Sequence, residues 1–495
     1  MRMDKEKLSP FDWLNLLGLS GIAVICYCYV WGYSTFAEKH VQLPFLNFPI
    51  FVGEMLLMFC VGVYCLRWRP RTEGVRLGHL LIMSYAAFIL AKAFWGYAKW
   101  GPLALRHAAL LYYPVFIFFA QTFFRKEFFS KPVRYLLTMI VLGTLVTQSF
   151  SRYFVLTLFL LAVILIRSLP EKGGRLIFAG ILLLGTPYHY FFETARMMIL
   201  GNIVSGFYLF LVACSVLKWR WQYKTGLLVV GMVVLISLAV RIAGYDRVRS
   251  IVDFRRMHKV FQKYDQKVQA RIDGFELMPR ESVQFYNPNS SIKEGPIDGE
   301  GMDPLAASLN GSAAGAGQEA VTETPSPPVR ESSVTDTNNA VFRLMIWRDM
   351  WQEYMREFSW FGFDFGKPLR SVSLEILKWG RGEWARDGWV SPHNSFFHII
   401  YRTGLMGLFF IGTVMWTLAG MIRICLDRKS VTGILLCGII INWFVASNFL
   451  VVLELPYTAI PIWSLYGLTM AYCSGLKRQS RKDIDTTEAP QLMSV

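Results

Sequence analysis

The chain has 495 residues, of which 54% are hydrophobic and 15% aromatic, and it carries a formal net charge of +16. This composition is too apolar for a soluble domain and indicates a polytopic membrane protein. The excess of 51 Lys and Arg over 35 Asp and Glu does not imply a nucleic-acid partner. Most of that excess falls in short loops, where basic residues fix membrane topology.

Apolar runs of about 17–25 residues predict transmembrane helices, because a helix of that length crosses the hydrocarbon core. In chain order the predicted spans are 11–33, 48–66, 77–95, 103–124, 133–149, 152–167, 175–192, 199–217, 225–243, 396–422, 431–453 and 456–474. The predicted fold class is an all-α polytopic membrane protein with about twelve transmembrane helices. Very short turns near residues 150 and 195 leave the number open by one or two.

Basic residues predict how these helices are oriented. Arginine and lysine cluster at the N-terminus, in alternate loops such as 67–76 and 125–134, and in the tail 475–495. The intervening short loops carry little more than Lys39, Lys99, Arg152 and Arg196. By the positive-inside rule, both termini are predicted to be cytoplasmic, and the long segment 244–395 lies outside the cytoplasm. The predicted domains are therefore helices 1–9 (1–243), this external loop, and helices 10–12 (396–474).

The external loop divides into three predicted parts. A charged helical stretch covers 245–280, and its apolar face lies either on the membrane or on the protein. The stretch 287–339 is rich in Gly, Ser, Ala, Pro and acidic residues, so we expect it to be disordered. Order is expected to return over 340–395, where Phe342, Ile346 and Met350 recur at helical spacing.

No metal or other cofactor is predicted for this loop. None of the eight cysteines falls between residues 244 and 395, which excludes a disulfide framework there, and their spacing does not suggest zinc. The loop also lacks an Asp-x-Asp pair.

Two stretches carry a resemblance to a known family. Arg343-Leu344-Met345-Ile346-Trp347 is followed by Trp360-Phe361-Gly362-Phe363-Asp364-Phe365-Gly366. Later, His393-Asn394-Ser395 is followed by an apolar helix and Gly404-Leu405-Met406-Gly407-Leu408. In order, spacing and sidedness these stretches resemble the O-antigen ligase and polymerase superfamily. Two features depart from its pattern: the 287–339 insert, and Arg402 where an acidic residue is common.

The resemblance implies a GT-C-like glycosyltransferase in a bacterial inner membrane. Such an enzyme takes a glycan from an undecaprenyl-pyrophosphate carrier and transfers it to an acceptor hydroxyl at the periplasmic face. The acceptor is the lipid A core (or a protein) for a ligase and another carrier-linked glycan for a polymerase, and the sequence does not separate these.

Within this resemblance, His393 matches the catalytic histidine and Arg343 the arginine of the loop. Arg152 and Arg196 are alternative matches for an arginine at the external start of a helix. Asn394 and Trp347 lie in the same motifs and are candidate substrate contacts.

The same residues suit this chemistry on physical grounds. Arginine forks match phosphate oxygens in bidentate geometry, so they would stabilise a departing lipid pyrophosphate. Imidazole is suited to remove a hydroxyl proton near neutral pH, so His393 is the candidate general base. Attack opposite the leaving group would invert the anomeric carbon. The structural alternatives are that His393 caps a helix, that Arg152 and Arg196 reach lipid phosphates, and that His398 has a structural or supporting role.

A secondary transporter or flippase for lipid-linked sugars is the alternative function. It predicts interrupted helices in matching positions of two halves, a symmetry that the sequence does not display.

Overall fold

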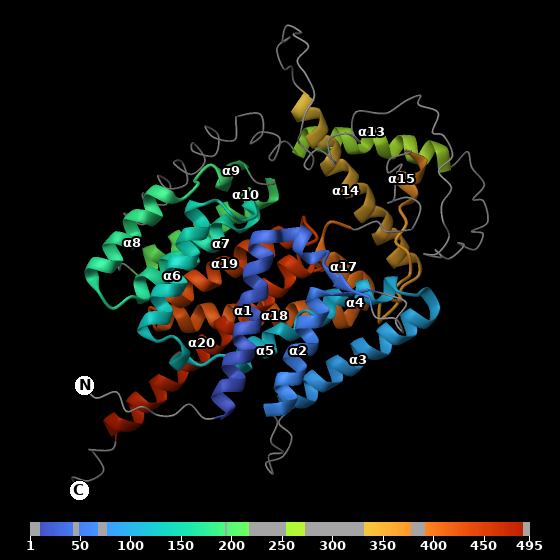
Figure 1. Cartoon of the computed structure of the whole chain (residues 1–495). Helices are drawn as coiled ribbons and strands as arrows, with labels where there is room; N and C mark the ends of the chain where they lie inside the picture. The colour runs from blue at the N-terminus through green and yellow to red at the C-terminus, as the bar shows by residue number, and fades with distance from the viewer. Residues whose placement is uncertain are drawn as a thin grey trace. The chain divides into compact units, whose positions relative to one another are not determined.

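The computed structural model describes residues 10–42, 49–67, 77–193, 196–216, 254–272, 331–377 and 392–488. Within these ranges the fold is all-α (Figure 1), apart from a small hairpin in which the two-residue strands β1 (His40–Val41) and β2 (Ile50–Phe51) pair antiparallel. The all-α class predicted from the sequence is therefore confirmed. The chain forms two compact units. We call Met1–Ala243, Arg356–Lys367 and Ser391–Val495 the helical unit, and Gly244–Met355 with Pro368–Val390 the loop unit.

The first part of the helical unit contains helices that range from single turns to 28 residues. They are α1 (Pro10–Ala37), α2 (Val52–Arg67), α3 (Leu77–Trp100), α4 (Leu103–Tyr112), α5 (Val115–Phe123), η1 (Lys126–Phe128), α6 (Lys131–Val146), η2 (Arg152–Phe154), α7 (Val155–Ser168), α8 (Lys172–Gly185), α9 (Tyr190–Glu193) and α10 (Arg196–Val216). The run predicted as one span over 103–124 is bent by 44° between α4 and α5. Pro114 lies at this break, where its missing N–H interrupts the helical hydrogen bonds.

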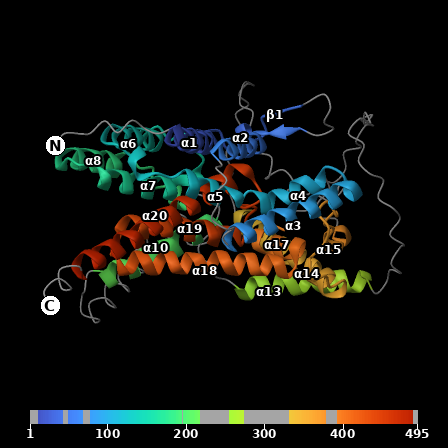
Figure 2. The same cartoon turned by 90° about the horizontal axis from the view of Figure 1, so that it is seen from below.

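The C-terminal part contains α17 (Ser395–Thr403), α18 (Leu405–Asp427), α19 (Val431–Ser447) and α20 (Pro456–Glu488). Helix α18 packs against α19 and α20, and Figure 2 shows these helices side by side. Helix α19 also packs along α10, and α20 along α5. Helices from the two ends of the sequence therefore build one core.

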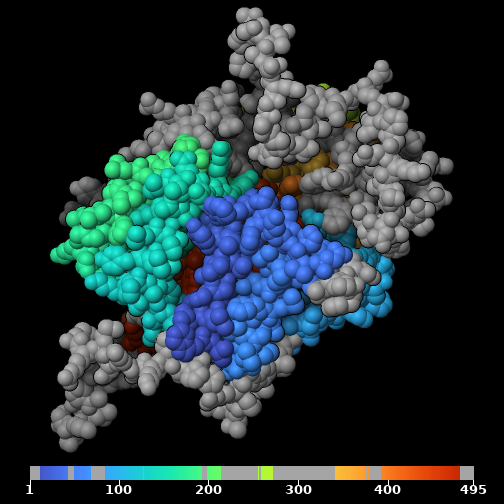
Figure 3. All heavy atoms as spheres, viewed as in Figure 1, coloured from blue at the N-terminus to red at the C-terminus, as the bar shows by residue number. Residues whose placement is uncertain are grey.

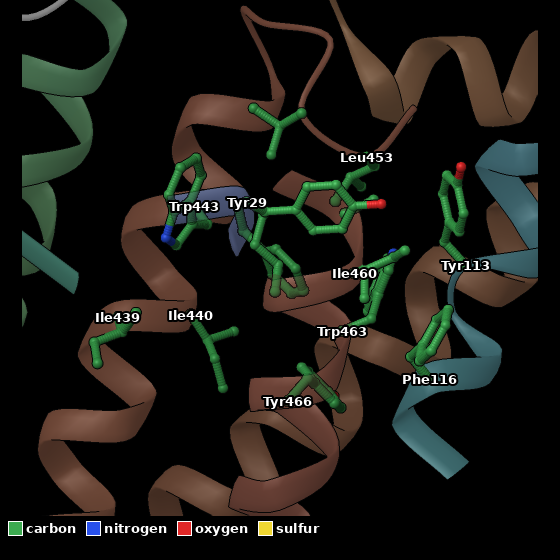
Figure 4. Close-up of a cluster of buried hydrophobic side chains, with 14 of the residues drawn as sticks. Tyr29, Tyr113, Phe116, Ile439, Ile440, Trp443, Leu453, Ile460, Trp463 and Tyr466 are labelled. Atoms are coloured by element: carbon green, nitrogen blue, oxygen red, sulfur yellow. The ribbon is translucent and has the colours of Figure 1, made fainter. Parts of the chain in front are cut away.

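Large aromatic side chains fill this core. Figure 4 shows Tyr29, Tyr113, Phe116, Ile439, Ile440, Trp443, Leu453, Ile460, Trp463 and Tyr466 packed together. Several polar tips find partners, as buried groups in an apolar interior require. The indole of Trp443 donates to Thr157 Oγ1 at 2.8 Å, and the hydroxyl of Tyr466 donates to the carbonyl of Val414 at 2.6 Å. These bonds fix α19 against α7 and α20 against α18.

The apolar helices identify a membrane protein. Among the described residues, Asp12–Ala37 and Leu405–Asp427 are long and apolar enough to cross a bilayer, and the bent pair α4–α5 would be a third span. Met198–Val212 and Val431–Ser447 are shorter apolar helices. Large apolar side chains such as Trp31 and Leu184 point outward from α1 and α8, which lie on the face seen in Figure 3. The total of about twelve spans remains a prediction.

The predicted span boundaries need several corrections. The predicted span 175–192 ends at Gly185, because Pro187 follows and α9 starts separately at Tyr190. The span 396–422 consists of two helices that are separated at Gly404. The span 431–453 ends at Ser447. Hydropathy measures apolar content and does not register such backbone breaks. The predicted span 225–243 lies outside the described residues.

The loop unit contains α13 (Phe254–Ile272), α14 (Glu331–Arg356, whose last residue belongs to the helical unit) and α15 (Val372–Ile376). Helix α13 lies within the predicted helical stretch 245–280. Helix α14 corrects the predicted disorder of 287–339, since residues 331–339 are helical. Four of its apolar side chains, Val341, Met345, Ile346 and Met350, are fully buried, and a helix anchored there extends readily toward its N-terminus. Residues 273–330 lie outside the described part of the chain.

A charged network holds the loop unit together. The carboxylate of Asp349 accepts hydrogen bonds from Ser371 Oγ at 2.6 Å, Ser373 N at 2.8 Å and Ser373 Oγ at 2.6 Å. Its neighbour Arg348 forms an ion pair with Asp265 of α13. Because only 8% of the Asp349 side chain and 17% of the Arg348 side chain are exposed, these bonds are largely shielded from water.

Replacing Asp349 with asparagine is expected to destabilise the loop unit by about 1–3 kcal/mol, because the amide supplies one acceptor oxygen instead of two. Hydrogen exchange over 331–377 should accelerate, as measured by mass spectrometry. Gln352→Ala changes an exposed position of the same helix and should leave exchange unchanged. Equal exchange in the two variants would show that the network does not stabilise the unit.

Candidate functional site

Two segments that are separated in the sequence meet in the helical unit. The turn 360–366 lies against the end of α17. The amide of Phe363 donates to the carbonyl of Tyr401 at 2.9 Å, and the amide of Leu405 donates to the carbonyl of Trp360 at 2.9 Å. The rings of Phe363 and Tyr401 have centroids 4.6 Å apart. The structure thus joins part of each stretch that carries the family resemblance.

Two glycines make this close approach possible. Gly362 has φ +66° and Gly404 has φ +58°, in the left-handed region that favours glycine. A Cβ on Gly362 would run into the backbone of Thr403, and one on Gly404 would run into the backbone of Trp360. Glycine is therefore required by both backbone conformation and space.

The Gly362→Ala variant is expected to separate the two segments or to destabilise the helical unit by at least about 1–3 kcal/mol, because it adds left-handed strain to a backbone clash. The thermal melting temperature of the purified protein should fall by several degrees. Gly412→Ala in α18 is the matched control, since a Cβ there meets nothing within 4 Å. Equal melting of the two variants would contradict the packing described for the turn.

Two lysines from α3 hold the same turn. Lys92 donates to the carbonyls of Phe361 and Gly362. Lys99 forms an ion pair with Asp364 at 3.0 Å. Burial raises the pKa of Asp364, but hydrogen bonding and charge attraction, chiefly from Lys99, outweigh it and leave this pKa below its ordinary value.

The amide of Gly366 donates to His107 Nδ1 of α4 at 2.9 Å. This bond leaves the proton of a neutral His107 on Nε2, the nitrogen that lies 3.5 Å from Arg402 Nη2. Because both atoms then carry hydrogens, that second contact is not a hydrogen bond. His107 therefore contributes to the site by fixing the backbone of the turn.

Arg402 lies at the centre of this polar cluster and is fully buried. Its Nη1 donates to the carbonyl of Asp364 at 2.9 Å, and its Nε donates to His398 Nε2 at 3.2 Å. Because Nε2 of His398 accepts this bond, the proton of a neutral His398 lies on Nδ1. Nδ1 lies 2.9 Å from Glu454 Oε1, but the angles are not those of a hydrogen bond. The Glu454–His398–Arg402 series thus links α17 to the turn and to the chain before α20.

The expectation that His398 has a structural or supporting role agrees with this arrangement. Sequence reasoning left the role of Arg402 in doubt, and it did not identify Glu454 or His107. A signal was present, because His398 and Arg402 are four residues apart and so share one helix face. Glu454 is also an isolated acid in an apolar run.

The predicted catalytic residue His393 is half-buried and lies two residues before the start of α17. Its φ of +49° is uncommon for a residue other than glycine. The next residue, Asn394, caps the helix, since its Oδ1 accepts from the amide of Phe397 at 2.9 Å. The side-chain oxygen of Asn394, a predicted substrate contact, therefore has a structural partner within its own helix.

The predicted arginines are distributed over both units. Arg152 is exposed in η2, with its guanidinium 5.0 Å from the centre of the Tyr190 ring. Arg196 is the first residue of α10. Arg343 and Trp347 are half-buried on α14 of the loop unit. His393 and Asn394 lie in the helical unit, at the start of the helix that packs on the turn.

Within the described ranges, no three His, Cys, Asp or Glu side chains are arranged to hold a metal ion. In comparisons with known proteins, no family model, curated protein or solved structure matches this chain.

Proposed function

We propose that this membrane protein is a glycosyltransferase that moves a glycan from an undecaprenyl-pyrophosphate carrier to an acceptor hydroxyl. The observation that supports it best is the contact between the turn 360–366 and α17–Gly404. Both segments contribute to the resemblance to O-antigen ligases and polymerases. Their close packing explains why each segment carries a glycine at the contact.

In this proposal His393 is the general base. Its imidazole accepts the proton of the acceptor hydroxyl while the acceptor oxygen bonds to the anomeric carbon. The bond from that carbon to the phosphate oxygen breaks, and undecaprenyl pyrophosphate leaves from the opposite side, which inverts the anomeric configuration. The left-handed backbone at His393 supports this role, because uncommon conformations cluster at functional sites.

Arginines stabilise the departing pyrophosphate in the same proposal. Arg343 contributes one guanidinium, and Arg152 or Arg196 contributes another. Fixed cations in a site of low dielectric stabilise charge that grows in the transition state. The resemblance implies the bacterial inner membrane and transfer at the periplasmic face. The distribution of basic loops supports cytoplasmic termini and an external long loop.

One observation favours the alternative of a transporter or flippase for lipid-linked sugars. Interrupted helices are typical of transporters, and the helical unit contains a bend at Pro114 and a break at Gly404. His107 and Arg402, one from each interrupted pair, approach each other. A transporter would move the carrier-linked sugar without forming a glycosidic bond, which separates the two functions experimentally.

Deletion of the gene, followed by gel analysis of surface glycans, tests the proposal in cells. Loss of all polymer from lipid A identifies a ligase, and retention of single repeat units identifies a polymerase. Carrier-linked glycan trapped on the cytoplasmic side would identify a flippase instead. Unchanged surface and protein-linked glycans would contradict a transferase.

A further inference from the structure

Helix α13 of the loop unit has two distinct faces. On one, Val268 is fully buried, and the Phe261 ring lies 5.9 Å from the guanidinium carbon of Arg348 on α14. Asp265, the one acidic residue of α13, forms an ion pair with Arg348. Helix α13 also packs against α15. The sequence left open whether the apolar face of this helix lies on the membrane or on the protein. In the structure, this face packs on other parts of the loop unit.

The opposite face carries a regular row of cations. Arg255, Lys259, Lys263 and Lys267 follow one another at intervals of four residues, and all four are exposed. A step of four residues keeps side chains on one side of a helix, and twelve residues at 1.5 Å each span about 18 Å. Among the side chains of α13 whose burial the structure describes, the other exposed polar ones are His258, Gln262, Gln266 and Gln269. The described exposed face therefore carries four positive charges and no acid to balance them.

We propose that this basic face binds the phosphate headgroups of anionic lipids at the surface of the bilayer. Rows of Lys and Arg on an amphipathic helix bind anionic membranes, because the cations are attracted to the lipid phosphates. The predicted span 225–243 would hold α13 near a bilayer, because the helix begins eleven residues after that span. An extended linker of that length reaches at most about 40 Å. This inference does not depend on the glycosyltransferase proposal.

The test uses the full-length protein in lipid nanodiscs. One set contains neutral phosphatidylcholine, and the other contains phosphatidylcholine with phosphatidylglycerol in a 7:3 ratio. Hydrogen exchange of peptides covering 254–272 is expected to slow about threefold or more in the anionic discs. This slowing is smaller than the full effect that four cations near the surface can have on membrane binding. High salt should remove the difference, because it screens exposed charges.

The variant R255Q/K259Q/K263Q/K267Q removes the row and is expected to exchange equally in both discs. Its control, Gln262→Ala with Gln266→Ala, changes exposed neutral positions of the same helix and should keep the difference. Equal exchange of the natural chain in both discs would overturn the inference, as would a difference that persists in the charge variant. Protection by soluble alginate in neutral discs, without protection by anionic lipid, would overturn it in favour of an acidic polysaccharide.

Discussion

Replacing His393 with alanine or asparagine is expected to abolish glycan transfer while membrane insertion and folding remain intact. A positioned general base contributes about 10²–10⁴-fold to the rate, so activity should fall by that factor in a transfer assay with purified protein. The asparagine variant isolates the chemistry from the backbone, because asparagine tolerates the left-handed conformation that His393 adopts. Both variants should be inactive if the imidazole accepts the proton.

His189→Ala is the matched control. This histidine is exposed, its ring lies against Tyr190, and it has no role in the proposed reaction. Its activity should equal that of the natural protein. Full activity in His393→Asn, or equal loss in His189→Ala, would contradict the assignment of the base. Loss in His393→Ala alone would point to backbone strain instead of proton transfer.

Replacing Arg402 with alanine should destabilise the helical unit by about 3–5 kcal/mol, the usual effect of removing one partner from a buried charged network. The variant loses the donors to the carbonyl of Asp364 and to His398 Nε2 and leaves a cavity in a fully buried position. The melting temperature in detergent, followed by tryptophan fluorescence, should fall accordingly. Arg402→Lys should recover only part of the loss, because an ammonium cannot reproduce the fork geometry.

Arg423→Ala is the control for Arg402, since Arg423 is an exposed arginine of α18 in the same unit. An exposed substitution of this kind changes stability by at most about 0.5 kcal/mol. If Arg402→Ala melted at the same temperature as Arg423→Ala, the buried cluster would not hold the turn to α17.

Much of the helical framework could be predicted from the sequence, because apolar runs and helices coincide. The predicted span 11–33 lies inside α1, and 77–95 lies inside α3. The bend between α4 and α5 also had a local sequence signal, namely Pro114 itself. The end of α8 was missed although Pro187 follows it, because hydropathy does not register a backbone break. The start of α14 at Glu331 was missed because it depends on packing more than on composition.

The candidate site was predicted only in part. The motifs directed attention to the turn 360–366 and to His393, because their residue types matched a family pattern. Their mutual packing could not be predicted, since it depends on backbone hydrogen bonds such as Phe363 to Tyr401, between segments almost forty residues apart. The approach of Glu454 to His398 was missed for the same reason, whereas the four-residue spacing of His398 and Arg402 on α17 was visible in the sequence. Sequence spacing reveals neighbours on one helix but not neighbours from different helices.

The most direct test of the glycosyltransferase proposal is transfer by the purified protein in liposomes. The donor is a labelled oligosaccharide on undecaprenyl pyrophosphate, and the acceptors are lipid A core and a second carrier-linked glycan, supplied separately. The proposal predicts a new glycosidic bond of inverted anomeric configuration to one acceptor, with release of undecaprenyl pyrophosphate. Movement of the donor across the bilayer without bond formation, by folded protein, would contradict it.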